Sequence, residues 1–267
     1  MTPASARQNV RLESGETLAL DLRPPADPAQ PWFLYLHGLG STRNGEKARY
    51  FEQELTARGF GFARFDFRGH GDSGGRMASL TLTRQLDDVR AIVAHLAAGM
   101  DRAAPPRELI PIGSSLGGLT AAWFTARDGA VGRSPLPIGR QILIAPAFRI
   151  LERYLAALGD FGRQRWEREG TFRFVGPWFE FDLEWAAIVD GRNYPPEELL
   201  ETTALPTLLL HGTADRSAPF SLSVEFAAGC RRVKPELVAI EGGDHRLTAQ
   251  KSELLDAIVR FVDATAG

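Results

Sequence analysis

The 267-residue sequence predicts an α/β fold with a mostly parallel central sheet flanked by helices. The main reason is that short apolar segments bounded by turn residues alternate with segments of helical periodicity from about residue 32 onward. Hydrophobic residues at 44% and charged residues at 24% are ordinary for a globular protein and exclude a disordered chain. We expect residues 1–267 to form one domain, because single α/β domains commonly reach about 250 residues.

The expected strands begin with a hairpin across Ser14 and Gly15, formed by residues 10–12 and 17–22. The strands that follow are short and apolar, as buried strands of a parallel sheet are. They are expected at residues 32–37, 60–67, 108–113, 141–145, 207–211 and 236–241.

Helices are expected between these strands, at residues 45–58, 83–98, 116–127, 221–232 and 250–263. Residues 83–98 show this periodicity, and Thr83 is the expected start signal. Their apolar side chains share one helical face: Leu86, Val89, Ile92, Val93 and Leu96.

Residues 149–204 break this alternation. They separate two expected strands and contain ten of the chain's 25 aromatic residues. A connection of this length without a strand–helix pattern is unusual in a compact protein unless it has a function. We therefore expect a functional excursion from the sheet at this point.

Composition excludes several function classes. A net charge of −2 gives no global attraction to nucleic acid. The single cysteine, Cys230, excludes an internal disulfide and a cysteine-based zinc site. No apolar run approaches the roughly 18 residues that span a bilayer, and the first residues lack the apolar core of a secretion signal. We expect a cytoplasmic protein without a membrane span.

Two glycine-serine pentapeptides compete as nucleophile motifs. The first, Gly71-Asp72-Ser73-Gly74-Gly75, spells the motif of chymotrypsin-like proteases, with His37 and Asp66 in the matching order. That fold is all-β, however, so the α/β alternation argues against it. The overlapping pattern from Gly69 to Gly74 also fits a dinucleotide-binding loop, but helical periodicity resumes only near Thr83. A glycine-rich surface loop is the better interpretation.

The second pentapeptide, Gly113-Ser114-Ser115-Leu116-Gly117, lies between an expected strand and an expected helix. A sharp strand-to-helix turn exposes a serine Oγ, and glycines two residues on either side avoid collisions in the turn. The amide of Leu116 would lie at a helix N-terminus, where it can stabilise an oxyanion. Ser115 is therefore the candidate nucleophile, and the alternative is a serine that only caps the helix.

His245 is the candidate base among five histidines. It follows the last expected strand, on a loop at the carboxyl end of the sheet, where ligands bind in such folds. His95 falls within a helix, His70 lies in the glycine loop, and His37 and His211 each precede a glycine at a strand end, which suits a structural turn.

Asp215 is the candidate acid. It lies 30 residues before His245 in the turn His211-Gly212-Thr213-Ala214-Asp215, and it can orient the imidazole and stabilise its cation. Asp244 adjoins His245 in the chain, so its side chain should diverge from that ring. Asp190 lies within the excursion and is less well placed.

These motifs together resemble the α/β-hydrolase superfamily over essentially the whole chain. The matching stretches are His37-Gly38-Leu39-Gly40-Ser41, the run from Phe65 to Ser73, the Ser115 turn, the Asp215 turn and Asp244-His245, in the superfamily's order Ser, Asp, His. The sequence is most similar to the branch of serine-aminopeptidase-like hydrolases, cinnamoyl/feruloyl esterases and the mitochondrial palmitoyl-protein thioesterase. Ser217-Ala218-Pro219 departs from the many relatives that have valine before the proline.

The resemblance implies an α/β-hydrolase fold with a lid at about 149–204, inserted before the strand that carries the acid turn. It implies a serine hydrolase of carboxylic ester or thioester type, acting on a small-molecule substrate through an acyl-enzyme without metal or organic cofactor. Ser115 would attack, His245 would transfer protons, Asp215 would orient His245, and the amide of Leu39 would be the second oxyanion donor.

The aromatic content of the excursion favours acyl or aryl groups as substrates, with Trp178, Phe179 and Trp185 as candidate binding residues. The other explanation is that these rings form a small core of their own. Two further functions stay open. A serine aminopeptidase would need a carboxylate for the substrate amine, such as Glu180, Asp182 or Glu184. A noncatalytic binding module is the second, although all three triad candidates are present.

Overall fold

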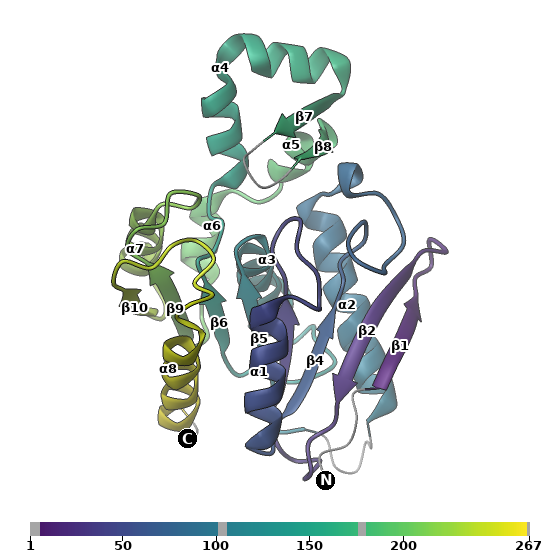
Figure 1. The fold of residues 1–267 in the computed structure, drawn as a ribbon, viewed down its shortest axis with the longest axis vertical. Coiled ribbons are helices and arrows are strands. Elements are labelled where there is room, and N and C mark those ends of the chain that lie inside the picture. The colour runs from purple at the N-terminus through teal and green to yellow at the C-terminus, as the bar shows by residue number, and fades with distance from the viewer. Residues whose placement is uncertain (1–5, 101–105, 176–179, 266–267) are drawn as a thin grey trace.

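The computed structural model describes residues 6–100, 106–175 and 180–265 of the chain. An eight-stranded sheet runs through its centre in the order β1-β2-β4-β3-β5-β6-β9-β10 (Figure 1). The strands β1 and β2 form an antiparallel hairpin, and β2 pairs antiparallel with β4. The pairs from β4 through β10 are all parallel. The predicted α/β fold with a mostly parallel sheet is confirmed.

The strands lie close to their predicted positions. The edge hairpin and the first central strands are β1 (Ala6–Arg11), β2 (Thr17–Arg23), β3 (Trp32–Leu36) and β4 (Gly61–Phe65). The remaining strands of the sheet are β5 (Leu109–Ser114), β6 (Gln141–Ile144), β9 (Thr207–Gly212) and β10 (Glu236–Ile240). Every residue of β3, β4, β5, β6 and β9 is buried, because helices cover both faces of a parallel sheet.

Helices form a layer on each face of the sheet (Figure 1). On one face, α1 (Glu46–Ala57) and α8 (Lys251–Ala264) bury side chains such as Phe51 and Ile258 in one apolar cluster. On the other face, α2 (Leu82–Gly99), α3 (Leu116–Phe124) and α7 (Phe220–Gly229) contribute to a second cluster. These two clusters hold the helices against the sheet and leave the carboxyl ends of the parallel strands at one edge.

The start of α2 corrects one prediction. Thr81 caps the helix, because its hydroxyl accepts the backbone N–H of Arg84 at 3.1 Å. Thr83, the predicted start signal, lies within the helix, and its hydroxyl binds Asp190 at 2.5 Å and Tyr194 at 2.7 Å. Both threonines fit the sequence rule for a cap, but only Thr81 accepts a backbone N–H of the first turn, whereas the Thr83 hydroxyl contacts residues more than 100 positions away.

Residues 150–202, here called the α4–α6 segment, leave the sheet after β6 and return before β9. The segment contains α4 (Ile150–Glu169), the hairpin of β7 (Thr171–Val175) and β8 (Glu180–Glu184), α5 (Ala186–Gly191) and α6 (Pro196–Thr202). It stands at the edge where the parallel strands end, and Gly159, with non-helical backbone angles, bends α4 (Figure 1). The sequence of this segment shows no alternation of strand and helix patterns, so these individual elements were not predicted.

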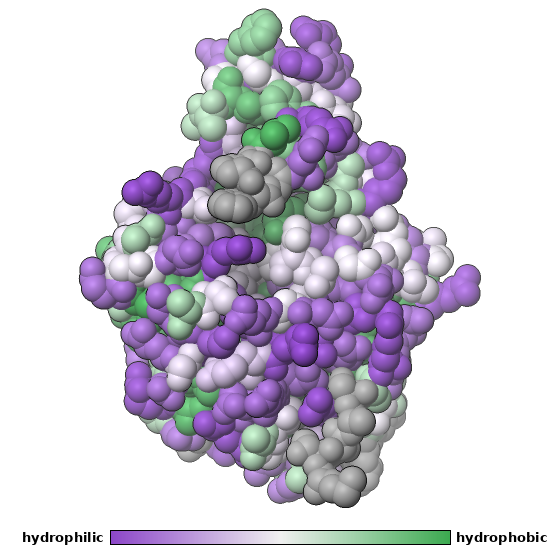
Figure 2. Space-filling view, in the orientation of Figure 1, coloured by the Kyte–Doolittle hydropathy of each residue, from purple (hydrophilic) through white to green (hydrophobic). Residues whose placement is uncertain are grey.

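The α4–α6 segment has a small apolar core centred on Trp166, Phe181, Leu183 and Ile188. This core also packs against Leu39, Met77 and Leu80 of the sheet-bearing part. Figure 2 shows hydrophobic residues gathered on this segment and at its junction with the rest of the molecule, whereas the surface below is mostly hydrophilic. Among the described residues, no helix has the length and apolarity required to cross a membrane.

Candidate active site

Ser115 occupies a sharp turn between β5 and α3. Its backbone has φ 55° and ψ −118°, a conformation that L-residues rarely adopt and that occurs preferentially at functional sites. A Cβ at Gly113 would collide with the backbone of Gly117, and one at Gly117 would collide with the carbonyl of Leu36. The glycine spacing in the motif is therefore a steric requirement of this turn. Ser115 stands at the N-cap position of α3, yet its hydroxyl makes no capping bond.

The Ser115 hydroxyl faces His245 instead. Its Oγ lies 2.9 Å from Nε2 of His245, and Nδ1 of His245 lies 2.7 Å from Oδ2 of Asp215. His245 comes from the loop after β10 and Asp215 from the loop after β9, so neighbouring parallel strands bring both to the same edge as the serine. The three predicted triad residues thus form one continuous chain of hydrogen bonds.

Asp215 is fully enclosed by its hydrogen-bond donors. Its Oδ1 accepts the backbone N–H groups of Ser217 and Ala218, both at 2.8 Å. Burial by itself would raise the pKa of Asp215, but the bonds from His211, His245 and the Ala218 amide hold it well below its usual range. The carboxylate therefore stays charged and can stabilise a protonated His245.

His211 is a site residue that the sequence reasoning assigned only to a turn. Its Nε2 lies 3.0 Å from Oδ2 of Asp215 and 2.8 Å from the carbonyl of Ala218, while its Nδ1 lies 2.7 Å from the Ser223 hydroxyl. The carbonyl can only accept, so Nε2 carries the proton and donates to both oxygens. The four-residue spacing between His211 and Asp215 was the available signal.

The loop between β3 and α1, residues 37–45, approaches the serine turn closely. A Cβ at Gly38 would lie 3.1 Å from Cβ of Ser115 and 3.2 Å from the carbonyl of Ser114. Leu39 follows Gly38, and Leu116 begins α3, where the first N–H groups of a helix have no partner within it. The two predicted oxyanion donors therefore belong to two different elements that meet at the Ser115 turn.

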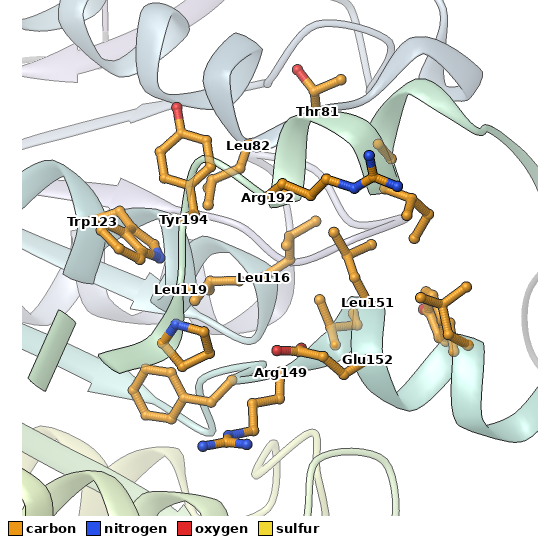
Figure 3. Close-up of a pocket in the computed structure, with 18 of the residues that line it drawn as sticks. Thr81, Leu82, Leu116, Leu119, Trp123, Arg149, Leu151, Glu152, Arg192 and Tyr194 are labelled. Atoms are coloured by element: carbon orange, nitrogen blue, oxygen red, sulfur yellow. The ribbon is translucent and has the colours of Figure 1, made fainter. Parts of the chain in front are cut away.

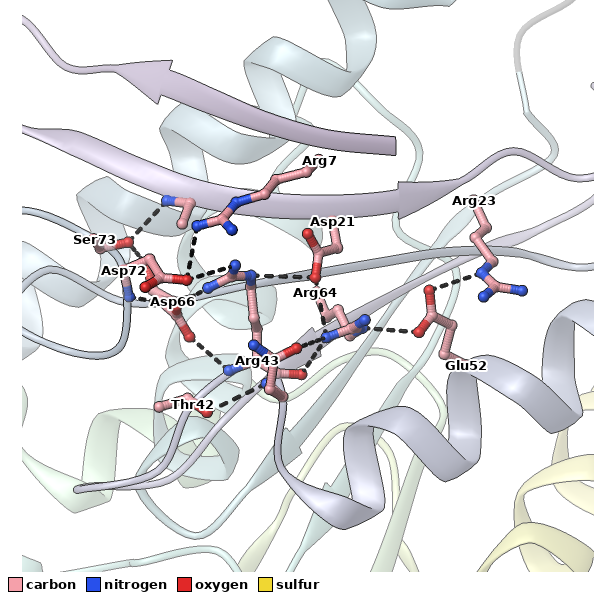
Figure 4. A network of polar contacts seen from close by, with 12 residues as sticks. Arg7, Asp21, Arg23, Thr42, Arg43, Glu52, Arg64, Asp66, Asp72 and Ser73 are labelled. Carbon is pink, nitrogen blue, oxygen red and sulfur yellow. Dashed lines mark hydrogen bonds and ion pairs between the residues drawn. The ribbon is translucent and has the colours of Figure 1, made fainter. Parts of the chain in front are cut away.

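Buried polar contacts hold this loop (Figure 4). The backbone N–H of Arg43 donates to Oδ1 of Asp66 at 2.6 Å, and the Arg43 guanidinium binds Asp66, Asp21 and Asp72. At the start of the loop, the N–H of Phe67 donates to Nε2 of His37 at 3.1 Å. Because the end of β4 and this loop share so many contacts, the Leu39 amide has a defined position before any substrate binds.

The competing motif around Ser73 has a structural role. The Ser73 hydroxyl accepts the N–H of Ala19 at 2.9 Å and donates to the carbonyl of Asp66 at 2.5 Å. The Asp66 side chain is committed to Arg43. His95, on α2, lies 2.6 Å from the side chain of Gln8, away from the site. None of these residues joins the Ser115 cluster.

A cavity of about 560 Å³ opens beside Leu39 and Leu116 and extends beneath the α4–α6 segment. Figure 3 shows Leu116, Leu119 and Trp123 of α3 on one side and Leu151 of α4 on the other. The cavity falls within the usual size range of small-molecule sites, and most of its wall is apolar. Its charged lining residues are Arg149, Glu152, Arg163, Arg192 and Glu225.

The aromatic residues of the α4–α6 segment divide between its core and this cavity. Trp166 is buried, and its Nε1–H donates to the carbonyl of Leu183 at 2.9 Å. Trp185, predicted as a binding residue, lines the cavity and packs against Trp166 with ring centroids 5.4 Å apart. The other two predicted binding residues, Trp178 and Phe179, lie outside the described residues.

The three carboxylates suggested for an aminopeptidase are not in the cavity wall. Phe181 and Leu183 of β8 line the cavity, and alternate residues of a strand point to opposite faces. Glu180 and Asp182 instead pair with Arg173 of β7, and Glu184 accepts the Ser79 hydroxyl. Strand alternation would have separated these two sets, had the sequence indicated a strand here.

Sequence comparison gives an independent result. The sequence profile of the alpha/beta hydrolase family matches residues 33–259. Over 256 residues the chain is 27% identical to the AB hydrolase superfamily protein YisY of Bacillus subtilis, covering 85% of this chain and 89% of the relative. It is 26% identical over 230 residues to the mitochondrial palmitoyl-protein thioesterase ABHD10 of Mus musculus, covering 81% of this chain and 69% of the relative.

Solved structures agree in fold. A putative hydrolase from Agrobacterium vitis S4 superposes with a TM-score of 0.83 at 25% identity, covering 97% of this chain and 98% of the other. Est1E from Butyrivibrio proteoclasticus with bound ferulic acid gives a TM-score of 0.75 at 21% identity, covering 95% and 99%. With its mostly parallel sheet, its strand-to-helix serine turn and a family profile matched over most of its length, the chain belongs to the alpha/beta hydrolase family.

Proposed function

We propose that this protein is a serine hydrolase that cleaves carboxylic esters or thioesters of apolar acyl or aryl acids through an acyl-enzyme. The observation that carries the proposal is the continuous hydrogen-bond chain from Ser115 through His245 to Asp215. Leu116, the residue after Ser115, lines an apolar cavity together with Leu39. The three residue types and both distances are those of an activated nucleophile.

In the acylation step, Ser115 Oγ attacks the substrate carbonyl carbon while Nε2 of His245 takes the hydroxyl proton. The negative charge that forms on the carbonyl oxygen accepts hydrogen bonds from the amides of Leu39 and Leu116. Asp215 stabilises the imidazolium across the 2.7 Å contact with Nδ1. The bond to the leaving alcohol or thiol then breaks, and His245 gives the leaving group its proton.

In the deacylation step, His245 takes a proton from a water molecule, and the resulting hydroxide attacks the Ser115 ester. The tetrahedral intermediate uses the same two amides. When the bond to Ser115 Oγ breaks, His245 returns its proton to the serine, and the carboxylic acid leaves. Each cycle therefore consumes one water molecule and restores all three side chains.

The cavity favours an apolar acid portion in the substrate. Its volume of about 560 Å³ and its apolar wall suit an acyl chain or an aromatic ring that extends from the carbonyl carbon. Each methylene buried there contributes about 0.8 kcal/mol. The α4–α6 segment supplies much of the wall, including Leu151, Phe181 and Trp185, and we assign it the role of the lid.

The test is a substrate panel with matched serine variants. The panel contains p-nitrophenyl esters of increasing chain length, an acyl-CoA and an aminoacyl-naphthylamide. We expect ester or thioester turnover, and Ser115→Ala should lower kcat by about 10⁴- to 10⁶-fold without unfolding the protein. Ser73→Ala is the control, because the hydroxyl of Ser73 binds the backbone of Ala19 and Asp66. Full activity of Ser115→Ala would refute the proposal.

The same panel tests the alternatives. An aminopeptidase must neutralise a substrate ammonium, and the cavity carboxylates available for that are Glu152 and Glu225. If the naphthylamide were the preferred substrate and Glu152→Gln raised its KM, the peptidase would be the better description. Absence of turnover on every substrate would favour a binding module.

A further inference from the structure

The residue before the nucleophile anchors a second set of polar contacts. Ser114 ends β5 and is buried, and its Oγ accepts a hydrogen bond from Nζ of Lys47 on α1 at 2.9 Å. The phenol of Tyr35, a buried residue of β3, is also hydrogen-bonded to Ser114. Three elements thus converge on the hydroxyl that precedes the Ser115 turn, and the hydrolytic steps above use none of these side chains.

Lys47 also faces the loops that carry the triad. Asp215 of the loop after β9 and Asp244 of the loop after β10 attract its ammonium, and Arg246 repels it. Burial, opposed by these two carboxylates, lowers the pKa of Lys47 to about 8. From α8, Lys251 approaches the same end of α1, where it pairs with Glu46. The Lys47 ammonium therefore binds Ser114 at the serine turn and is also attracted by Asp215, the carboxylate of the triad.

The residue type at this position is informative. The chain contains 31 lysines and arginines, and only Lys47, Lys234 and Lys251 are lysines. An arginine would remain protonated at any pH at which the protein is folded, whereas a lysine amine can lose its proton when it is desolvated. The position beside the nucleophile therefore carries a charge that can be lost within the working pH range of a hydrolase.

We propose that Lys47 is a positioning residue for the hydrolytic reaction. Its ammonium holds Ser114 and thereby the turn that presents Ser115. Its positive charge also stabilises the negative charge that forms on the substrate oxygen during attack. This inference rests on the proposed function. It has two consequences, a loss of rate when Lys47 is removed and a loss of rate when Lys47 loses its proton. A purely structural lysine would produce the first consequence without the second.

The experiment is the pH dependence of kcat/KM between pH 6 and 9.5, with a p-nitrophenyl ester as substrate. Wild-type kcat/KM should decline above about pH 8, as Lys47 deprotonates. Lys47→Met should lower kcat/KM at pH 7 by about 10- to 100-fold, the usual loss for a hydrogen bond to a charged group, and should lack the alkaline decline. Lys234→Met is the matched control, because Lys234 is exposed and its ammonium donates to the carbonyl of Ala228.

Ser114→Ala provides a second variant that keeps the charge. Without its hydrogen-bond acceptor the ammonium is less stabilised, so the alkaline decline should move to lower pH while kcat falls far less than in Ser115→Ala. The inference is overturned if Lys47→Met matches the wild type within twofold at every pH, or if it keeps the alkaline decline. A wild-type profile that stays flat up to pH 9.5 also overturns it.

The Ser115→Ala variant separates this inference from the proposed function. An inactive Ser115→Ala beside a fully active Lys47→Met would refute only the role of Lys47. An active Ser115→Ala would refute the serine mechanism itself, and the inference with it. Melting temperatures of all variants, measured at pH 7 and pH 9, identify any loss of activity that comes from unfolding.

Discussion

His211 donates a hydrogen bond to the same carboxylate oxygen of Asp215 that faces His245. The distances to Oδ2 are 3.0 Å from Nε2 of His211 and 2.7 Å from Nδ1 of His245. The His211 side chain is fully buried, whereas the His245 side chain is partly exposed. The buried ring therefore fixes the orientation of the carboxylate, and the carboxylate in turn orients the ring beside Ser115.

Removal of this support should slow the reaction. His211→Phe keeps an aromatic ring against Phe220 but removes the donor to Asp215. We expect kcat to fall by about 10- to 100-fold, because a hydrogen bond to a charged group is worth about 1.5–3 kcal/mol. Steady-state kinetics on one ester measure the effect. His95→Phe, which removes a contact with Gln8 far from the site, should leave kcat unchanged. Equal losses in both variants would contradict the proposal that His211 orients Asp215.

The charge of Asp215 is the second testable feature. Asp215→Asn keeps the size of the side chain but cannot stabilise the imidazolium, and its amide can present a donor to Nδ1. We expect kcat to fall by about 10⁴-fold with little change in KM. Single-turnover kinetics would show whether acylation itself is slowed. Near-normal turnover would indicate that another carboxylate acts as the acid, and Asp244 would be the first to test.

The loop that carries Leu39 should lose stability in acid. Burial, together with nearby His70, lowers the pKa of His37 to about 4, and its neutral Nε2 accepts the N–H of Phe67. An unfolded histidine titrates near pH 6.5. Between about pH 6.5 and pH 4 the unfolded state therefore binds a proton that the folded state does not, and the free energy of unfolding falls by about 1.4 kcal/mol per pH unit.

The matched variant for this prediction is His37→Gln. Its amide oxygen can still accept the Phe67 N–H, but the side chain does not titrate. Urea unfolding at pH 7 and pH 5 should show a smaller acid-induced loss of stability in the variant than in the wild type. If the two proteins lose the same stability, His37 is not the titrating group, and buried His70, whose pKa burial also lowers, becomes the candidate.

Chain-length selectivity tests the cavity. Trp185 lines it, so Trp185→Ala should lower kcat/KM for a long-chain ester about tenfold more than for an acetate ester, because only the longer chain reaches the removed ring. Phe161→Ala is the control: Phe161 belongs to the same segment but is 82% exposed. Equal losses on both esters, parallel to the melting temperature, would assign Trp185 to the core of the segment alone.

Local patterns were sufficient for the sheet and for the choice of triad candidates. The apolar runs at β3, β5 and β9 predicted buried strands, because a strand covered on both faces is apolar throughout. Chain order and the ends of these strands then selected Ser115, Asp215 and His245. Their catalytic roles are predictions that the variants above test.

The same patterns did not predict the α4–α6 segment. Its helices and hairpin bury aromatic residues such as Trp166 and Phe181 against one another and against Leu80 of a distant loop, so no regular period marks their apolar faces. Thr83 was misassigned for a similar reason, since its partners Asp190 and Tyr194 belong to this segment.

The sequence by itself determined the class of fold, the strand-to-helix turn at Ser115 and the order of the candidate residues, because periodicity, glycine spacing and turn chemistry act between residues that are close in the chain. The tertiary structure alone decided which polar groups meet. Lys47 and Ser114 lie 67 residues apart, and Arg43 and Asp66 lie 23 residues apart. Their contacts exist because β3 pairs with both β4 and β5, which brings the ends of these strands beside α1 and the loop before it.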